Sequence, residues 1–130
     1  MRRIVAIGVG CRAGVAGGTI AALARRALAE AGAPEGERKM FTLAAKADEP
    51  GVIEAARIIG AALTPLSLAA LNAQTERILT PSAMAQARFG APNIAEAAAL
   101  AGAGEGGRLL GPRLAADGAT CAIALSPERP

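Results

Sequence analysis

The segment Gly8–Gly14, GVGCRAG, combines residue types that are suited to binding an anion. It follows a short apolar run and precedes a stretch with apolar residues at helical spacing. Glycines leave backbone N–H groups accessible, and the start of a helix carries a partial positive charge. Arg12 adds a guanidinium, which matches the geometry of a carboxylate. We expect this loop either to seat an anionic group or simply to allow a tight turn from strand to helix.

Gly8, Gly10 and Ala13 also match the G-x-G-x-x-G/A pattern of dinucleotide-binding loops. That use requires an acidic residue about 20 positions later, at the end of the second strand. The acids that follow the predicted second strand, Asp48 and Glu49, come too late, and no Gly-Lys-Ser/Thr sequence follows for a P-loop. Nucleotide binding is therefore the least favoured use of the loop.

Cys11 lies in the same loop, where a helix start and Arg12 are able to activate a thiol. The chain has no histidine, however, so no imidazole is available as the base for a cysteine nucleophile. We expect Cys11 to be a half-buried packing residue at a strand end and Cys121 to lie in the core. Two distant cysteines without histidine also give no metal-ligand spacing, so we expect neither a metal nor a cofactor.

A second polar group, Lys46-Ala47-Asp48-Glu49, follows the second predicted strand. The carboxyl ends of parallel strands meet in one crevice, so we expect Lys46 to face the glycine loop there. The alternative is a solvated lysine beside a helix start. Asp48 and Glu49 are explained as capping groups of the helix that begins at Pro50.

Two further polar residues lie at predicted helix starts. Ser82 falls in the first turn of a helix that opens at Thr80-Pro81, and Glu96 is expected to complete a capping box with Asn93. Arg113, in a Gly-Pro-rich connection, is expected on the surface.

The elements that must position these residues alternate along the chain. Apolar runs predict strands, and spacing of three and four residues predicts helices. The predicted strands cover 3–9, 39–44, 62–66, 108–110 and 119–125, and the helices cover about 20–31, 50–59, 67–71, 80–89 and 93–100. We predict an α/β fold in which residues 1–130 form a single domain. The expected architecture is a three-layer α/β/α sandwich on a mixed, mostly parallel sheet of about five strands.

Composition excludes several classes of partner. The 14 Lys and Arg residues against 11 Asp and Glu residues are scattered, and Trp and Tyr are missing, so we expect no nucleic-acid partner. The most apolar stretch, Ala55–Leu71, contains Arg57 and Pro65 and is too interrupted for a membrane span. No signal peptide opens the chain, so we expect a cytoplasmic protein.

Four blocks together resemble the family formed by CobE and the C-terminal domain of CbiG, proteins of cobalamin (vitamin B12) biosynthesis. They are GVGCRAGV at 8–15, KADEPGV at 46–52, AEAAAL at 95–100 and ATCAIAL at 119–125. The resemblance covers nearly the whole chain. Nine residues of these blocks are candidate ligand-binding positions, and Ser82 is the tenth. They are Gly8, Gly10, Cys11, Arg12, Gly14, Lys46, Asp48, Glu49, Ser82 and Glu96.

This resemblance implies a role in the corrin branch of tetrapyrrole metabolism. The expected ligand is a carboxylate-rich corrinoid or precorrin intermediate. The protein would bind it as a carrier or accessory factor, with other corrin-pathway enzymes as further partners. Val9, Val15 or Met84 would contact the apolar macrocycle. The alternative is an enzyme, like CbiG, that opens a lactone and releases a two-carbon fragment. Lys46 or Glu49 would then act as acid–base and Arg12 as electrostatic stabiliser.

Overall fold

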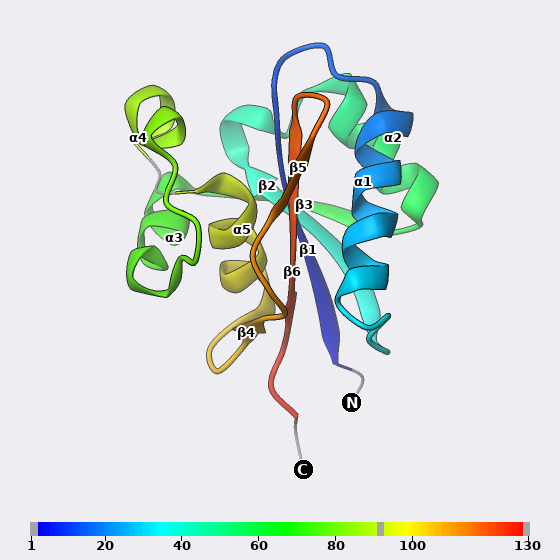
Figure 1. The fold of residues 1–130 in the computed structure, drawn as a ribbon, viewed down its shortest axis with the longest axis vertical. Coiled ribbons are helices and arrows are strands. Elements are labelled where there is room, and N and C mark those ends of the chain that lie inside the picture. The colour runs from blue at the N-terminus through cyan, green and yellow to red at the C-terminus, as the bar shows by residue number, and fades with distance from the viewer. Residues whose placement is uncertain (1–2, 91–92, 129–130) are drawn as a thin grey trace.

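The computed structural model describes residues 3–90 and 93–128. It shows a six-stranded sheet with helices on both faces (Figure 1). The helices are α1 (Gly17–Glu30), α2 (Pro50–Ile59), α3 (Leu68–Asn72), α4 (Ala83–Phe89) and α5 (Ile94–Ala103), with short 3-10 turns at Ala44–Lys46 and Thr75–Arg77. The strands are β1 (Ile4–Cys11), β2 (Glu37–Leu43), β3 (Ala62–Leu66), β4 (Arg108–Leu109), β5 (Leu114–Ala116) and β6 (Ala119–Leu125). The predicted α/β sandwich is confirmed.

The sheet is mixed, with the order β3-β2-β1-β6-β4 and β5 paired to β6. Strands β1, β2 and β3 are parallel, whereas β6 runs antiparallel to β1, β4 and β5. The sixth strand is β5, which sequence analysis missed because three residues are too few to show a period. Asp117 and Gly118, both with positive φ, turn β5 back into β6.

Helices α1 and α2 cover one face of the sheet and pack on each other. Ile20, Leu23 and Val52 belong to their buried apolar stripe. Gly51 lets α2 lie directly against the loop that precedes α1, because a Cβ there would lie 1.9 Å from the Val15 carbonyl oxygen. The left-handed Gly60 ends α2, as glycine commonly does.

Helix α5 covers the other face and runs very close to β1. Its buried residues are mostly alanines, and a Cβ on Gly8 would lie 1.9 Å from the carbonyl oxygen of Ala95. Small residues on both sides therefore set the distance between α5 and β1. The helix also continues to Ala103, beyond the predicted end at Leu100, and Gly102 in its last turn leaves room for the ring of Phe41.

Helices α3 and α4 lie outside α5, at the left of Figure 1. Helix α4 begins at Ala83, three residues later than predicted, and the Ser82 hydroxyl caps it by accepting a hydrogen bond from the Ala85 N–H at 3.1 Å. Ala85 is the single buried residue within α4. This helix is therefore held to the protein by little apolar contact.

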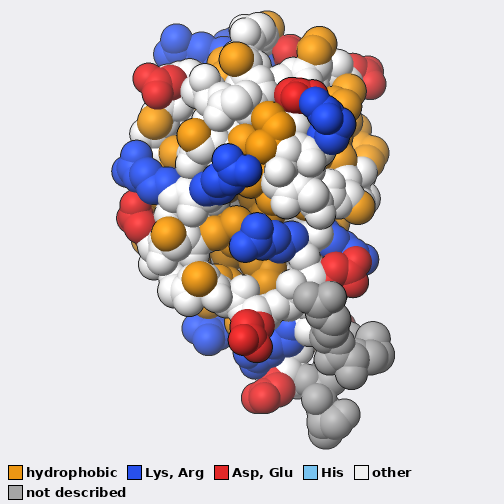
Figure 2. Space-filling model, turned by 90° about the vertical axis from the view of Figure 1, so that its right-hand side faces the viewer, with side chains coloured by type: hydrophobic (Ala, Val, Ile, Leu, Met, Phe, Trp, Pro, Cys, Tyr) orange, Lys and Arg blue, Asp and Glu red, His pale blue; other side chains and the backbone are white. Residues whose placement is uncertain are grey.

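The face formed by α1 and α2 is turned toward the viewer in Figure 2, where acidic and basic side chains alternate with hydrophobic ones. Such a mixed surface has no extended field of one sign. Within residues 3–90 and 93–128, no helix is long and apolar enough to cross a membrane.

Candidate functional site

A cleft of about 460 Å³ opens at the carboxyl end of β1. The end of β1, the β5–β6 hairpin and α4, all in the upper part of Figure 1, form most of its walls, and Lys46 and Ile94 complete the lining. The Arg12 N–H donates to the Gly118 carbonyl at 2.8 Å, which ties the end of β1 to the hairpin. The lining residues are Gly10, Cys11, Arg12, Lys46, Ser82, Met84, Ala85, Arg88, Phe89, Ile94, Arg113, Ala115, Ala116, Asp117, Gly118, Ala119 and Thr120.

Positive charge dominates this lining. Arg12, Lys46, Arg88 and Arg113 contribute four cations, whereas Asp117 is the single acidic lining residue. These cations come from four different parts of the chain, so only the tertiary structure brings them together. Three of the four are arginines, which bind carboxylates through paired hydrogen bonds.

Apolar groups form much of the remaining surface of the cleft. Ile94 lies at the start of α5, and Met84 and Phe89 come from α4. Met84 is 62% exposed, so its side chain is accessible at the surface of the cleft. The Phe89 ring centroid lies 5.5 Å from the Lys46 ammonium and 5.7 Å from the Arg88 guanidinium, within cation–π range. The cleft therefore offers both apolar surface and cations, two of which lie close to the Phe89 ring.

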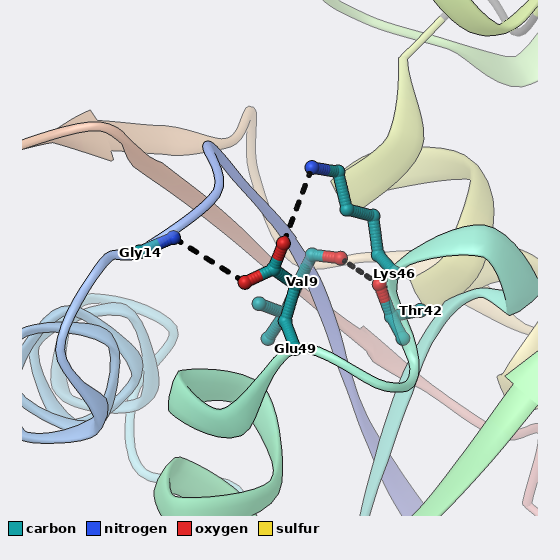
Figure 3. Close-up of polar contacts among 5 residues, drawn as sticks. All are labelled: Val9, Gly14, Thr42, Lys46 and Glu49. Atoms are coloured by element: carbon teal, nitrogen blue, oxygen red, sulfur yellow. Dashed lines mark hydrogen bonds and ion pairs between the residues drawn. The ribbon is translucent and has the colours of Figure 1, made fainter.

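Glu49 occupies part of the predicted anion seat. Figure 3 shows its carboxylate between the Gly14 N–H, at 3.3 Å, and the Lys46 ammonium, at 4.0 Å. The expectation that the Glu49 side chain caps α2 is wrong, because it makes no capping hydrogen bond. It turns instead toward the loop after β1. An external anion would consequently meet the arginines of the cleft more readily than the Gly14 N–H.

The cysteines are poor nucleophiles in this environment. Burial raises the pKa of the Cys11 thiol, an effect that Lys46 opposes and Glu49 adds to. Burial also raises the pKa of Cys121 to about 12. Since a thiolate is the reactive form, both positions favour the inert thiol near neutral pH. The packing roles expected for both cysteines agree with their positions, although Cys11 also lines the cleft.

Glu96 lies beneath the cleft and is fully buried. The Asn93 side chain accepts from the Glu96 N–H at 3.0 Å, as the predicted capping box requires. The reciprocal bond is not formed. The Glu96 carboxylate accepts instead from the backbone N–H groups of Leu79, Thr80 and Arg113, at 2.8, 2.9 and 2.9 Å.

The structure brings half of the ten candidate binding residues into the lining of the cleft, namely Gly10, Cys11, Arg12, Lys46 and Ser82. The other five, Gly8, Gly14, Asp48, Glu49 and Glu96, do not line it. Gly8 lies under α5, Asp48 is exposed, and Glu49 stands behind Lys46.

Of the three apolar residues expected to meet a ligand, only Met84 lines the cleft. Val9 is fully buried and Val15 lies outside the lining. Arg88 was not predicted from the sequence, and Arg113, expected on the surface, is partly exposed and lines the cleft. The spacing of four residues between Met84 and Arg88, which places both on one helical face, was the available signal for Arg88.

The fold and the cleft define an α/β/α sandwich domain with a cationic cleft at the carboxyl end of its parallel strands. The family model "Cobalamin synthesis G C-terminus" matches residues 5–124, and the chain belongs to this family. It is 35% identical over 119 residues to protein CobE from Sinorhizobium sp, which covers 91% of this chain and 77% of that protein.

Two solved structures are similar as well. The crystal structure of CobE, a protein from the cobalamin (vitamin B12) biosynthetic pathway, has a TM-score of 0.86 at 33% identity over 99% of this chain and 95% of that one. The cobalamin biosynthesis protein chiG from Agrobacterium tumefaciens str. C58 has a TM-score of 0.71 at 32% identity over 95% and 99%. The resemblance identified from the sequence is thereby confirmed.

Proposed function

We propose that this protein binds a carboxylate-rich corrinoid intermediate in the cleft at the end of β1 and serves as its carrier or accessory factor. The observation that carries the proposal is that four cations and several apolar side chains line the same cleft. Corrin precursors are rigid apolar macrocycles with acetate and propionate groups at the periphery. The two patterns are complementary in both charge and polarity.

The energetics of the cleft are adequate for such a ligand. A hydrogen bond between charged partners contributes about 1.5–3 kcal/mol, so two or three arginine–carboxylate contacts give substantial affinity. Contact of the ring with Met84 and Phe89 adds the burial of apolar surface. A cleft of about 460 Å³ is small for a whole corrin macrocycle. One edge of the ring would therefore be bound, which leaves the rest accessible to another corrin-pathway enzyme.

Titration with hydrogenobyrinic acid, a cobalt-free corrin with free carboxylates, tests the proposal. We expect saturable binding with a shift in the corrin absorption spectrum. A corrinoid with amidated acetate and propionate groups should bind much more weakly, because the cations then lose their partners. NAD and ATP serve as further controls. Binding of hydrogenobyrinic acid weaker than about 1 mM, or saturable binding of a nucleotide alone, would overturn the proposal.

The second candidate is an enzyme that acts on the corrinoid, and the Lys46–Glu49 pair favours it. The side chains of Lys46 and Glu49 are only 12% and 21% exposed, and Lys46 lines the cleft. A partly buried acid–base pair of this kind is able to transfer protons. Mass analysis of a precorrin lactone after incubation with the protein separates the two roles. An unchanged mass supports the carrier, whereas the loss of a two-carbon fragment supports the enzyme.

Two contacts weigh against nucleotide binding. Gly8, the first glycine of the dinucleotide pattern, packs under Ala95 of α5 instead of opening to solvent. The Gly14 N–H already donates to Glu49. Gly8 and the Gly14 N–H are thus both engaged within the protein, although Gly10 lines the cleft.

A further inference from the structure

Glu96 connects two walls of the cleft without lining it. One of its carboxylate oxygens accepts from the N–H groups of Leu79 and Thr80, in the segment that leads into α4. The other oxygen accepts from the N–H of Arg113, in the segment that leads into β5. Three backbone donors from two separate segments therefore converge on one buried side chain.

We infer that Glu96 is a positioning residue that sets Arg113 and the start of α4 at the distance a ligand requires. The inference rests on the proposed ligand binding in the cleft and deepens it. Glu96 does not touch the cleft, so it cannot act directly on the ligand. Its effect must pass through the two segments that it holds, and each of them ends in cleft residues.

The backbone at 79–80 and at 113 lies outside the helices and strands, although Phe89 packs on a buried cluster nearby and Leu114 pairs with Cys121. Helix α4 buries only Ala85, and Arg113 follows a Gly-Pro connection after β4. Asn93 reinforces the arrangement, since its side-chain amide donates to the Thr80 carbonyl at 2.6 Å. Asn93, the N-cap residue of α5, and Glu96 in its first turn are both fully buried and thus hold the entry to α4 through separate hydrogen bonds.

The variant Glu96→Gln separates the two walls because glutamine has one acceptor oxygen and one NH₂ group. The glutamine oxygen should face Leu79 and Thr80, because it keeps two hydrogen bonds there and only one at Arg113. The NH₂ group then faces the Arg113 N–H, which loses its acceptor. Glu96→Gln should therefore release Arg113 while the start of α4 keeps its hydrogen bonds. Glu35→Gln, an exposed carboxylate in the loop between α1 and β2, is the matched control.

Amide hydrogen exchange measures this release without any ligand. We expect the Arg113 amide to exchange at least tenfold faster in Glu96→Gln than in the parent protein or in Glu35→Gln. Amides of β1 and β2 should change little. Unchanged exchange rates at Arg113, Leu79 and Thr80 together would overturn the inference, whatever the outcome of the ligand experiments, because one of the two sides must lose its acceptor in either orientation of the glutamine amide.

A double-mutant cycle with hydrogenobyrinic acid then tests positioning against a general loss of stability. Arg113→Ala should weaken binding about tenfold in the parent protein and less than twofold in Glu96→Gln, where Arg113 is already misplaced. Arg12→Ala, on a different wall, should cost the same factor in both backgrounds. Equal effects of Arg113→Ala in both backgrounds would mean that Glu96 is only structural. If the parent protein does not bind this corrin, the proposed function fails, and the exchange measurement decides on Glu96 by itself.

Discussion

The cations of the cleft differ in how strongly the protein itself engages them. Lys46 pairs with Glu49 and lies over Phe89, and Arg88 also contacts that ring. Arg12 is exposed and forms no ion pair within the described part of the chain. Its guanidinium is therefore the charge most available to a ligand.

Replacing Arg12 by alanine should weaken the binding of hydrogenobyrinic acid about tenfold to a hundredfold, the loss of one hydrogen bond between charged partners. Fluorescence or absorption titration gives the dissociation constant. Arg25→Ala removes the same charge from the exposed face of α1, and this control should leave affinity unchanged. Equal effects of the two variants would show that only overall charge matters.

The buried thiol of Cys121 makes stability depend on pH in alkaline solution. Its pKa is about 12 in the folded protein against 9.0 as the reference value, so above pH 9 the unfolded chain loses a proton that the folded chain keeps. Stability should consequently fall as pH rises from about 9 toward 12, by up to tenfold in the folding equilibrium per pH unit. Denaturant unfolding at several pH values measures the slope.

The variant Cys121→Ala is the control for that slope. It should be less stable at every pH because of lost packing, yet its stability should fall less steeply above pH 9. The chain has no tyrosine, which removes one competing alkaline titration. Parallel slopes in the two proteins would contradict a role for this thiol.

At the scale of elements, the close contact of α5 with β1 is the feature that places the start of α5 in the cleft. A methyl group on Gly8 would lie 1.9 Å from the Ala95 carbonyl and 2.6 Å from the Ala99 nitrogen, and both neighbours are rigid backbone atoms. Either α5 moves away or the strand bends. Ile94, at the first turn of α5, would move with it.

Gly8→Ala should therefore destabilise the protein by about 1–3 kcal/mol or more, as overpacking does. Gly18→Ala is the matched substitution, because nothing lies within 4 Å of a Cβ there. It should be neutral or stabilising by up to about 1 kcal/mol, since alanine favours the helix. Thermal or urea unfolding compares the two. If the Gly8→Ala protein were as stable as the parent protein but bound the ligand poorly, Gly8 would have a role in binding and not in packing.

For the molecule as a whole, the net charge of +3 is modest, and the arrangement of charge matters more than its sum. The face over α1 and α2 mixes both signs (Figure 2), whereas the cleft lining has four cations and one acid. Attraction of an anionic ligand is thus concentrated at one end of the sheet. Salt screens such exposed charges over about 10 Å at 0.1 M and about 3 Å at 1 M.

The affinity for hydrogenobyrinic acid should consequently fall several-fold between about 0.1 M and 1 M salt. The Arg12→Ala protein should show a weaker dependence, because it has one charge fewer to screen. Isothermal titration at several salt concentrations provides both slopes. An affinity that rises with salt would point to a mainly apolar contact and against a role for the four cations.

Local patterns were sufficient to predict most of the fold. Periodicity located β1, α1, β2, α2, β3 and β6 to within a few residues, because each element is long enough to repeat its apolar pattern. The start of α4 was misplaced and β5 was missed. Both are short and gain their form from neighbours, α4 from the Ser82 cap and β5 from pairing with β6.

The candidate site was predicted less completely, since its residues are distant in the chain. Motif spacing placed Arg12 and Lys46 at strand ends, where topology alone makes them neighbours. It did not reveal that Glu49 and Glu96 turn away from a ligand toward backbone N–H groups of the protein. Which donor a carboxylate accepts from depends on segments up to 35 residues away.

The sequence by itself determined most of the order of strands and helices, the family and the presence of a glycine-rich turn between a strand and a helix. These follow from local periodicity, turn residues and short motifs. Only the tertiary structure decided that Arg88 and Arg113 join Arg12 and Lys46 around one cleft, that Gly8 serves packing, and that Glu96 holds two walls of the cleft. The reason is physical: charge, steric fit and hydrogen bonding act over distances in space, which spacing along the chain does not specify.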